Sequence, residues 1–479
     1  MTTVSAVQEA NAADSARHRR DPVHRISQLL DPGWLHVVRQ RAGLGVVIAR
    51  GRIEGSKVIV FCTDATTSGG AIGGQECSLI AAAIEAACGE RCPVIGIWHS
   101  GGAKLAEGVV AMDGIGHMFA AMVQASGQVL QLSLILGPAA GGAAYGPALT
   151  DLVIMSDGGR VFITGPDIVR SVTGERIDMN GLGGPEVHSR RSGVAHLVAD
   201  SDEAAFRQAR NVVTLFAQPG HVDVSLVGGE IDLRAFLPES PRRAYDVRPL
   251  VRAIIDGSEG GSSFLELQEK WAPNIVVGLG RIGGRTVGVI ANNPLRKGGC
   301  LDSLSAEKGA RFVRMCDAFA IPLLVLVDVP GYLPGITQEW DGVVRRGAKL
   351  LHAFAEAVVP RISLVTRKSY GGAYIAMNSR SLGATAVLAW PEAEIAIMGA
   401  TSAVEILYRR QLAQVEEPER DALRAKLAAE HELMAGSVAK AMKIGVVDEI
   451  IDPAETRCRI GQLLAAAATD RGRHRNIPL

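Results

Sequence analysis

The chain has 479 residues, of which 47% are hydrophobic and 21% charged, with 50 Lys and Arg against 50 Asp and Glu. This length exceeds one ordinary core and predicts a multidomain globular protein. The balanced charge gives no overall field for nucleic acid or an acidic membrane, and no segment reads as a membrane span or a signal peptide, so we expect a cytoplasmic location.

The seven cysteines lie mostly within apolar runs, and their number is odd. They do not form two paired CxxC units, the spacing that would indicate a zinc site. We therefore expect buried, reduced thiols, which fit a reducing compartment, and no metal.

Short β-rich runs alternate with Ala-rich helical runs, which is the rhythm of an α/β protein. The residues before 45 predict a helical lead-in. A helix is expected over 78–92, then the strand VIGIWHSGG at 94–102. A longer helical run leads to a strand that ends in GPAAGG at 137–142, followed by a short helix and strands near 152–156 and 160–166.

The second half repeats this order. A helix over 307–322 leads to the strand LLVLVDVPGY at 323–332, a helical run at 348–357 and the strand RISLVTRKSYGG at 361–372. A short helix and strands near 385–391 and 394–400 follow, with a charged helical tail after about 402. The Pro-rich segment 218–250 reads as the connection between the halves.

Two glycine pairs keep one spacing across the halves. Gly101 matches Gly331 and Gly141 matches Gly371, each 230 residues apart. A register held over that distance predicts a duplicated domain. We place the domains at 1–238 and 239–479.

In both halves a β-branched strand ends in Gly-Gly and a short helix begins, so backbone N–H groups are expected free at a helix N-terminus. Glycine allows a ligand to approach such groups because it has no Cβ. Fixed N–H dipoles can stabilise an oxyanion that forms only in a transition state, and one lost donor typically costs about 3 kcal/mol. One such pair could be packing glycine; two pairs in register, each preceded by a second glycine turn, favour oxyanion sites.

Several motifs resemble one family. They are GPAAGGAAY at 137–145, SGVAH at 192–196, DVPGYLPG at 328–335, RKSYGGAY at 367–374 and AWPEAEIAIMGA at 389–400. With them the chain resembles the β chain of biotin-dependent acyl-CoA carboxylases, the carboxyltransferase component of acetyl- and propionyl-CoA carboxylases. The likeness runs from residue 24 to the C-terminal tail. It implies an α/β fold of two tandem crotonase-type (ClpP/crotonase-like) β-β-α superhelix domains, which agrees with the duplication.

The resemblance implies a reaction in which carboxybiotin gives carbon dioxide and the biotin ureido nitrogen removes the α-proton of an acyl-CoA. Two oxyanions form in succession and need two holes, while no protein acid or base is required. Carried over, the first hole is Gly141 and Gly142, and the second is Gly372 and Ala373. Further contacts to acyl-CoA or biotin would come from Gly102, Ala103, Lys104, Gly331, Tyr332, Gly371, Tyr374 and Ile375.

The resemblance also implies partners. A separate biotinylated α subunit, with biotin carboxylase and biotin carboxyl carrier parts, is expected because this chain has neither a biotin-attachment signal nor an ATP-grasp region. We expect a dimer-based hexamer whose active site forms at a dimer interface, with acyl-CoA on the first domain and biotin against the second domain of a neighbouring chain.

Substrate choice depends on Ile375, which stands where the propionyl-CoA carboxylases that we compare often have Asp. A bulky apolar side chain there should reshape the acyl pocket, so we predict that acetyl-CoA is carboxylated well and propionyl-CoA also accepted; a plain packing role is the alternative.

His99 and Lys104 replace the family's usual Asp and Arg, and Lys104 could meet a CoA phosphate as a point charge. Lys308 and Arg311 are further phosphate candidates, or a solvated helix face.

Two motifs predict other chemistry only superficially. VVGLGRIGG at 276–284 has the GxGxxG spacing, but a second strand follows in place of a helix, so we interpret it as a Gly-Gly hairpin. Ser100 follows a histidine without a GxSxG elbow and aligns with Pro330, which favours a structural turn.

Three alternatives remain open. The same fold could serve a propionyl-CoA-selective carboxylase, a transcarboxylase or a decarboxylase, and the partner chains would tell these apart. The chain could be an inactive scaffold, although both glycine pairs are present. A crotonase-type hydrolase or isomerase would need a positioned carboxylate, which the sequence does not indicate.

Overall fold

The structure, a computed structural model, describes residues 18–39, 43–228, 231–240, 243–257, 264–431 and 437–477. The chain divides into two compact units, a first unit of Met1–Pro219 with Arg473–Leu479 and a second unit of Gly220–Gly472. Residues 220–238, which we expected in the first domain, therefore belong to the second unit. That each unit is a complete carboxyltransferase domain stays a prediction.

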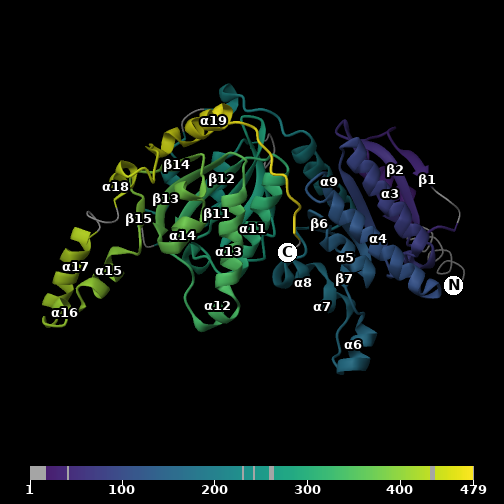
Figure 1. Cartoon of the computed structure of the whole chain (residues 1–479), viewed down its shortest axis with the longest axis horizontal. Helices are drawn as coiled ribbons and strands as arrows, with labels where there is room; N and C mark the ends of the chain where they lie inside the picture. The colour runs from purple at the N-terminus through teal and green to yellow at the C-terminus, as the bar shows by residue number, and fades with distance from the viewer. Residues whose placement is uncertain are drawn as a thin grey trace, which may run out of the picture. The chain divides into compact units, whose positions relative to one another are not determined.

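The first unit contains a sheet with the strand order β1-β2-β3-β4-β5-β6-β8, with β7 beside β5 (Figure 1). Its first three strands pair antiparallel, and the pairs from β3 onward are parallel. The strands are β1 (His36–Arg39), β2 (Val46–Ile53), β3 (Ser56–Thr63), β4 (Val94–Ser100), β5 (Gln131–Ala140), β6 (Leu152–Met155), β7 (Arg160–Phe162) and β8 (Leu197–Val198).

The second unit repeats this sheet in the order β9-β10-β11-β12-β13-β14-β16, with β15 beside β13. Again the first three strands are antiparallel and the rest parallel. The strands are β9 (Leu265–Leu267), β10 (Ile275–Ile282), β11 (Arg285–Asn292), β12 (Leu323–Val329), β13 (Arg361–Tyr370), β14 (Ala386–Ala389), β15 (Glu394–Ala396) and β16 (Glu449–Ile450).

Helices connect the parallel strands and cover the sheets, as Figure 1 shows for α11 and α13 over β11 and β12. The helices of the first unit are α2 (Pro22–Leu29), α3 (Gly74–Glu90), α4 (Val109–Ala125), α5 (Gly142–Ala148), α6 (Pro166–Thr173), α7 (Met179–Gly183), α8 (Pro185–Val187) and α9 (Asp202–Ala217). Those of the second unit are α10 (Arg248–Ile254), α11 (Ser303–Ala318), α12 (Ile336–Trp340), α13 (Val343–Glu356), α14 (Gly371–Ala376), α15 (Ala400–Leu407), α16 (Arg409–Leu412), α17 (Glu419–His431), α18 (Val438–Lys443) and α19 (Thr456–Ala466).

The predicted duplication is confirmed, but its spacing changes along the chain. Strands β2 and β10 begin 229 residues apart, at 46 and 275, as do β4 and β12, at 94 and 323. Strands β5 and β13 begin 230 apart, at 131 and 361. The second half therefore has one extra residue between its two central parallel strands. A constant spacing of 230 was wrong for everything that precedes this insertion.

Two further expectations can be compared with the elements. The helical lead-in holds for α2, but His36–Arg39 is a strand, because β1 pairs with β2 and completes the edge of the sheet. The hairpin predicted at 276–284 is confirmed: β10 and β11 pair antiparallel, and Gly283 and Gly284 make the turn with positive φ.

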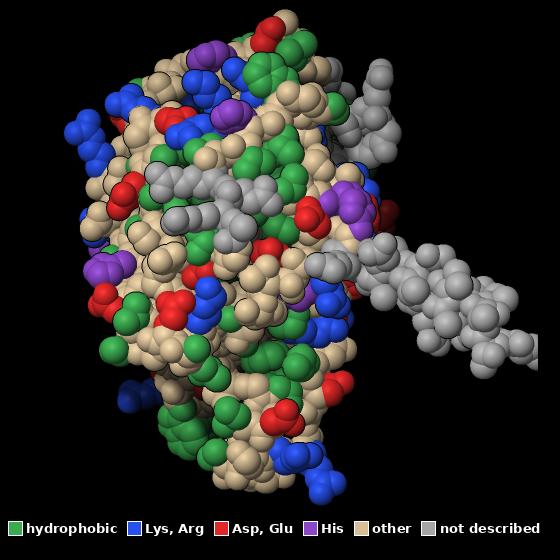
Figure 2. All heavy atoms as spheres, turned by 90° about the vertical axis from the view of Figure 1, so that its right-hand side faces the viewer, with side chains coloured by type: hydrophobic (Ala, Val, Ile, Leu, Met, Phe, Trp, Pro, Cys, Tyr) green, Lys and Arg blue, Asp and Glu red, His purple; other side chains and the backbone are tan. Residues whose placement is uncertain are grey.

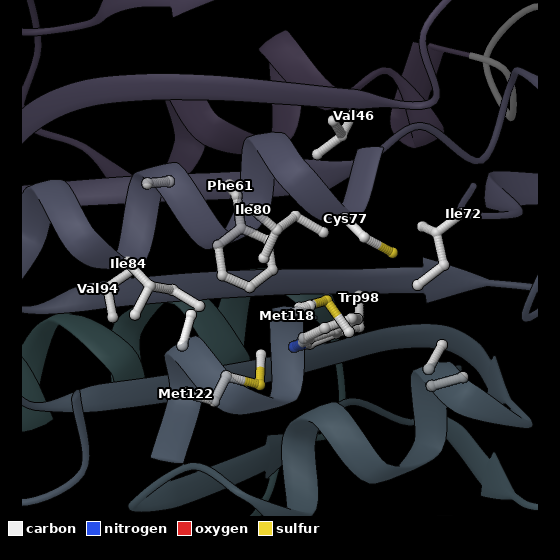
Figure 3. Packing of buried hydrophobic residues seen from close by; sticks show 14 of the residues in the cluster. Val46, Phe61, Ile72, Cys77, Ile80, Ile84, Val94, Trp98, Met118 and Met122 are labelled. Atoms are coloured by element: carbon white, nitrogen blue, oxygen red, sulfur yellow. The ribbon is translucent and has the colours of Figure 1, made fainter. Parts of the chain in front are cut away.

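The core of the first unit lies between its sheet and helices α3 and α4. Figure 3 shows Phe61 and Ile80 directed toward Trp98 and Met118. The rings of Phe61 and Trp98 meet edge to face at 5.2 Å, and Trp98 Nε1 donates to the Ser133 hydroxyl at 3.0 Å. Such an aromatic pair contributes about 0.5–1.5 kcal/mol beyond its buried area. This packing fixes β4 and β5, whose ends carry the glycine turns.

Candidate active site

The glycine turns of the first unit lie side by side at the ends of β4 and β5. Ser100 and Ala139 are partners in the sheet, so the residues two positions further on, Gly102 and Gly141, are neighbours. Both have positive φ, +103° and +56°. A Cβ on Gly102 would lie 3.0 Å from the Ala140 carbonyl oxygen, so this approach needs glycine.

Free donors follow at the start of α5. The N–H of Gly141 donates to the Phe162 carbonyl at 3.1 Å. Among the residues that the structure describes, the N–H groups of Gly142 and Ala143 have no acceptor. They belong to the first turn of a helix, where backbone N–H groups lack a helical partner. The pair with free donors is thus Gly142 and Ala143, one position beyond the pair expected from the sequence.

The second unit has the same arrangement at the ends of β12 and β13. Val329 pairs with Ser369, which brings Gly331 and Gly371 together, with φ of +141° and +59°. At the start of α14 the N–H groups of Gly372 and Ala373 have no acceptor in the described ranges. A Cβ on Gly372 would meet nothing within 4 Å, so a ligand has room above these donors.

The structure corrects one pairing between the turns. Gly102 accepts from Ile72 N–H at 2.9 Å, and Gly331 accepts from Leu301 N–H at 3.1 Å. Ala103 and Tyr332 make the matching bridges to the same two residues. The counterpart of Gly331 is therefore Gly102, and the expected match with Gly101 was wrong by one residue.

The remaining predicted contacts lie around the second turn. Tyr332 and Tyr374 are half-buried, and burial raises the pKa of Tyr332 to about 12, so its hydroxyl stays protonated. Ile375 follows Tyr374 on α14 and is 41% exposed. An exposed isoleucine beside free N–H donors is available to a ligand; the packing alternative predicts a buried side chain.

Ser100 is the last residue of strand β4, whereas we expected it in the turn itself. Its side chain is buried and accepts from the Gly102 N–H at 3.2 Å. Its structural counterpart is Val329, at the 229 spacing, whereas we expected Pro330.

Histidine 99 precedes this turn and is largely buried. Burial, followed by the nearby guanidinium groups of Arg25 and Arg20, lowers the pKa of His99 from 6.5 to about 4. Its Nδ1 lies 3.4 Å from Arg25 Nη1. A Cβ on Gly137 would clash with the ring, at 2.3 Å from Nδ1. The imidazole is thus neutral near pH 7 and packs against glycine backbone.

Lys104 makes ion pairs with two carboxylates. Its Nζ contacts Glu76, which is fully buried, and lies 3.8 Å from Glu107 Oε1. Burial by itself raises the pKa of Glu76, but hydrogen bonds from Lys104 and from backbone N–H groups outweigh it and lower the pKa. Sequence reasoning missed both carboxylates. The signal was present, because Glu76 is the third residue of α3 and forms a capping box with Gly73.

Lys308 is neither a phosphate contact nor part of a solvated face, so both readings of it were wrong. Its side chain is 1% exposed, and Nζ donates to the carbonyls of Gln268, Trp271 and Ile275, each at 2.9 Å. Burial lowers the pKa of Lys308 to about 7. Its neighbour on α11, Arg311, is half-buried.

A second pair that sequence reasoning left without a role lies under the second turn. Asp328 Oδ2 accepts from Arg367 Nε at 2.8 Å, and both side chains are nearly buried. The Arg367 guanidinium lies over the Tyr245 ring at 4.7 Å. This ion pair joins the ends of β12 and β13, three residues before Gly331 and four residues before Gly371.

The ranges that the structure describes contain neither a cluster of metal ligands nor a membrane-spanning helix. No group of three or more His, Cys, Asp or Glu side chains there could hold a metal ion. All seven cysteines are free thiols. No helix in those ranges is both long and apolar enough to cross a membrane.

Comparison with known proteins places this geometry in context. A family model, the carboxyl transferase domain, matches residues 29–477. The biotin-dependent acetyl-/propionyl-coenzyme A carboxylase beta6 subunit of Mycobacterium tuberculosis is 59% identical over 461 residues, which cover 96% of this chain and 97% of the relative. The propionyl-CoA carboxylase beta chain of Rhodococcus erythropolis is 55% identical over 468 residues, or 98% of each chain.

A solved structure agrees with the fold. Transcarboxylase 12S, a hexamer determined with methylmalonyl-coenzyme A and methylmalonic acid bound, matches with a TM-score of 0.89 at 38% identity. The match covers 99% of this chain and 98% of that one. The predicted α/β fold of two tandem crotonase-type domains is thereby confirmed.

Proposed function

The chain belongs to the carboxyl transferase family, and on this premise we propose that it transfers the carboxyl group of carboxybiotin to the α-carbon of a short acyl-CoA. It is the carboxyltransferase β subunit of a biotin-dependent acetyl-/propionyl-CoA carboxylase. One observation carries the proposed mechanism. Two equivalent turns, one in each unit, each present two neighbouring backbone N–H groups without an acceptor in the described structure.

These donors suit the charges of the reaction. Transfer of a carboxyl group to an acyl-CoA places negative charge on the thioester oxygen and on the ureido oxygen of biotin. The N–H groups of Gly142 and Ala143 would stabilise one oxygen, and those of Gly372 and Ala373 the other. Because the donors are fixed by strand and helix ends, they need little reorganisation when the charge develops.

Biotin would bind to one of the two turns through backbone N–H groups that donate to its ureido oxygen. When bound, it supplies the carboxyl group and the base for the α-proton, so the protein has to orient and to stabilise charge. His99 agrees with this division, because its pKa of about 4 makes the imidazole a weak base and its ring packs against Arg25 and Gly137. Biotin itself is carried by a separate subunit.

The contacts expected from the sequence stay part of the proposal. Gly102, Gly331 and Gly371 form the turns, and Ala103 and Tyr332 bridge them to neighbouring segments. Tyr374 lies on the first turn of α14. Lys104 as a contact to a CoA phosphate is the least supported of these, because two carboxylates already face its ammonium group.

Acetyl-CoA is the proposed preferred substrate, with propionyl-CoA also carboxylated. Ile375 supports this preference because it is exposed on α14, three residues beyond the free N–H of Gly372. One methylene in an apolar pocket changes specificity by only about 1–3 kcal/mol, so a preference is expected and exclusion is not.

The proposed assembly is a biotinylated α subunit with a dimer-based hexamer of this chain, in the cytoplasm. The first match among solved structures, transcarboxylase 12S, is described as a hexamer. Large hydrophobic side chains are exposed on both units, among them Leu105 at 94%, Trp340 at 85% and Ile397 at 84%. Figure 2 shows hydrophobic side chains gathered in patches between charged groups on one face. Exposed apolar area of this kind is typical of an interface.

The reverse reaction tests the proposal without any partner. The purified chain is mixed with free biotin and either malonyl-CoA or methylmalonyl-CoA, and release of acetyl-CoA or propionyl-CoA is followed. We expect biotin-dependent release from both, at a comparable or higher rate from malonyl-CoA. Release from methylmalonyl-CoA alone would overturn the preference, and no release from either would overturn the proposed function.

A further inference from the structure

Three backbone segments meet behind the first glycine turn. They are the start of β2 at Gly45, the segment Ile72–Glu76 that leads into α3, and the segment Gly102–Glu107 that follows β4. Backbone hydrogen bonds join the last two: Ile72 N–H donates to Gly102 O, and Lys104 N–H donates to Ile72 O, each at 2.9 Å. Lys104 is therefore two residues from Gly102, on the same short bridge.

The side chain of Glu76 connects all three segments. Its carboxylate accepts from Gly45 N–H at 3.1 Å and from Gly73 N–H at 2.9 Å, and it forms the ion pair with Lys104. Glu76 is fully buried, so an uncompensated charge would be costly and these three donors hold it in place. A buried anion thus ties the segment that carries Lys104 to the N-terminus of α3.

Glu107 adds a second attachment. Its Oε2 accepts from Gly74 N–H at 2.8 Å, and its Oε1 lies 3.8 Å from Lys104 Nζ. A Cβ on Gly73 would lie 2.2 Å from both carboxylate oxygens, so the close approach requires glycine there. The ammonium group of Lys104 is held between the two carboxylates.

The charges around Lys104 disfavour the binding of a phosphate to its ammonium group. Glu76 and Glu107 bring two negative charges to one positive charge, so the local sum is negative. The three side chains line a chamber of about 950 Å³, together with Gly74, Gln75 and Leu79. Glu107 is 34% exposed and Lys104 21%, so an anion in the chamber would lie near a carboxylate as well as the ammonium group.

In the second unit another pair holds the corresponding helix start: Asp302, the counterpart of Gly73 and 2% exposed, caps α11 and forms an ion pair with Lys297. At the 229 spacing the counterparts of Lys104 and Glu76 are Leu333 and Ser305. A Cβ on Gly331 would meet nothing within 4 Å, whereas one on Gly102 would lie 3.0 Å from Ala140 O. The turn held by the charged side chains is also the one that is packed against its neighbour.

We infer that Lys104, Glu76 and Glu107 form a positioning unit that holds the Gly102 turn against β5 and so keeps the first pair of N–H donors in place. This inference rests on the proposed function for its kinetic consequences. Lys104 is a positioning residue in this account and makes no contact with the nucleotide of CoA.

Two substrates separate positioning from phosphate binding. Lys104→Met and Lys104→Arg are assayed in the biotin-dependent decarboxylation of malonyl-CoA and of malonyl-pantetheine, which lacks the nucleotide phosphates. For Lys104→Met we expect kcat to fall about tenfold to hundredfold with either substrate, because displaced donors misalign the reacting groups. KM should stay within about twofold and Lys104→Arg should recover most of the loss, since an arginine keeps the ion pairs.

A matched control removes a different ion pair, which lies in the first structural unit but outside the positioning unit. Arg50 and Glu90 form an exposed pair on the surface, so Arg50→Met should leave kcat unchanged. A rise in KM for malonyl-CoA alone, with malonyl-pantetheine unaffected, would overturn the inference in favour of a phosphate contact. Unchanged kcat in Lys104→Met would overturn it as well.

Amide hydrogen exchange tests the inference without relying on enzymatic activity. Amide hydrogen exchange of residues 72–76 and 102–107 should accelerate at least about tenfold in Lys104→Met, because these segments lose their shared anchor. The exchange result stands even if the wild-type chain shows no decarboxylation, so failure of the proposed function and failure of this inference are distinguishable. If Lys104→Met does not fold, Glu107→Gln decides: faster exchange in both segments supports the unit, and unchanged exchange overturns it.

Discussion

The two units share a backbone and differ in their buried polar side chains. Their sheets have the same strand order, and each ends its two central parallel strands in a glycine turn before a short helix. In the first unit a largely buried neutral histidine, His99, packs on Gly137; at the corresponding positions of the second unit Asp328 pairs with Arg367. What both units keep is a pair of backbone N–H groups without an acceptor in the described ranges, so the donors of the proposed mechanism come from the backbone.

A second difference lies at the helix after the hairpin. Lys308 on α11 is buried and caps three carbonyls, while its counterpart on α3, Leu79, is half-buried and lines the chamber. The lysine closes the second unit around residues 268–275 at a place where the first unit stays open. The same backbone position is thus filled by a buried side chain in the second unit and lines an open chamber in the first.

The largest expected effect comes from filling the second turn. Gly372→Val should lower the biotin-dependent decarboxylation of malonyl-CoA by about 10²–10³, because the side chain occupies the space above the donors. The backbone of Gly372 does not have positive φ and its Cβ position is open, so the variant should fold. Gly116→Val, at an exposed and equally open glycine of α4, is the control. Near-normal activity of Gly372→Val would remove the second hole from the account.

The next effect concerns stability. Lys308→Leu gives the second unit an aliphatic side chain like that of the first, and leaves three carbonyl groups without their donor. Each unsatisfied buried group costs about 1–3 kcal/mol, so we expect a loss of at least about 3 kcal/mol in the free energy of unfolding. Urea denaturation followed by circular dichroism measures it.

A lysine on the surface provides the comparison for this variant. Lys349 is half exposed in an ion pair with Glu307, so Lys349→Leu should lower the free energy of unfolding by less than about 1 kcal/mol. A similar small cost for Lys308→Leu would show that the carbonyl contacts are unimportant for stability.

The first unit should lose stability in mild acid through His99. Its pKa is lowered in the folded chain, so the unfolded chain binds a proton at higher pH than the folded chain does. The contribution is fully present above pH 6.5 and is lost as the pH falls to about 4. The loss is at most about 3 kcal/mol, and His99→Asn should flatten this part of the stability profile.

An exposed histidine serves as the control for the acid experiment. His117→Asn, at a side chain that is 73% exposed on α4, should leave the profile unchanged. An unaltered acid profile in His99→Asn would mean that another group causes the loss.

The smallest effect concerns substrate choice. Ile375→Asp should shift the ratio of kcat/KM for malonyl-CoA and methylmalonyl-CoA by about tenfold toward methylmalonyl-CoA, within the range that one side chain in a pocket can provide. Its counterpart in the first unit is Tyr145, 53% exposed on α5, and Tyr145→Phe should leave the ratio unchanged. No shift in Ile375→Asp would support the plain packing alternative.

Sequence patterns predicted the backbone of this molecule better than its side-chain partners. Strand runs that end in glycine pairs define the duplication, because only glycine adopts the positive φ of Gly141 and Gly371 without strain. The one-residue insertion that changes the spacing from 229 to 230 lies between the starts of β12 and β13 and has no local signature. The burial of Lys308 could not be predicted from the sequence either, because its three acceptors are backbone carbonyls of a segment that is distant in the sequence.

In the proposed mechanism the protein supplies hydrogen-bond donors and no base, and deuterium exchange tests this most directly. Acetyl-CoA is incubated in D₂O with a preparation that releases acetyl-CoA from malonyl-CoA when biotin is added. Without biotin we predict no deuterium at the α-carbon above the rate in buffer, whereas acetyl-CoA formed from malonyl-CoA with biotin should carry the label. Enzyme-dependent labelling of acetyl-CoA without biotin would show that a protein side chain removes the proton and would contradict the account.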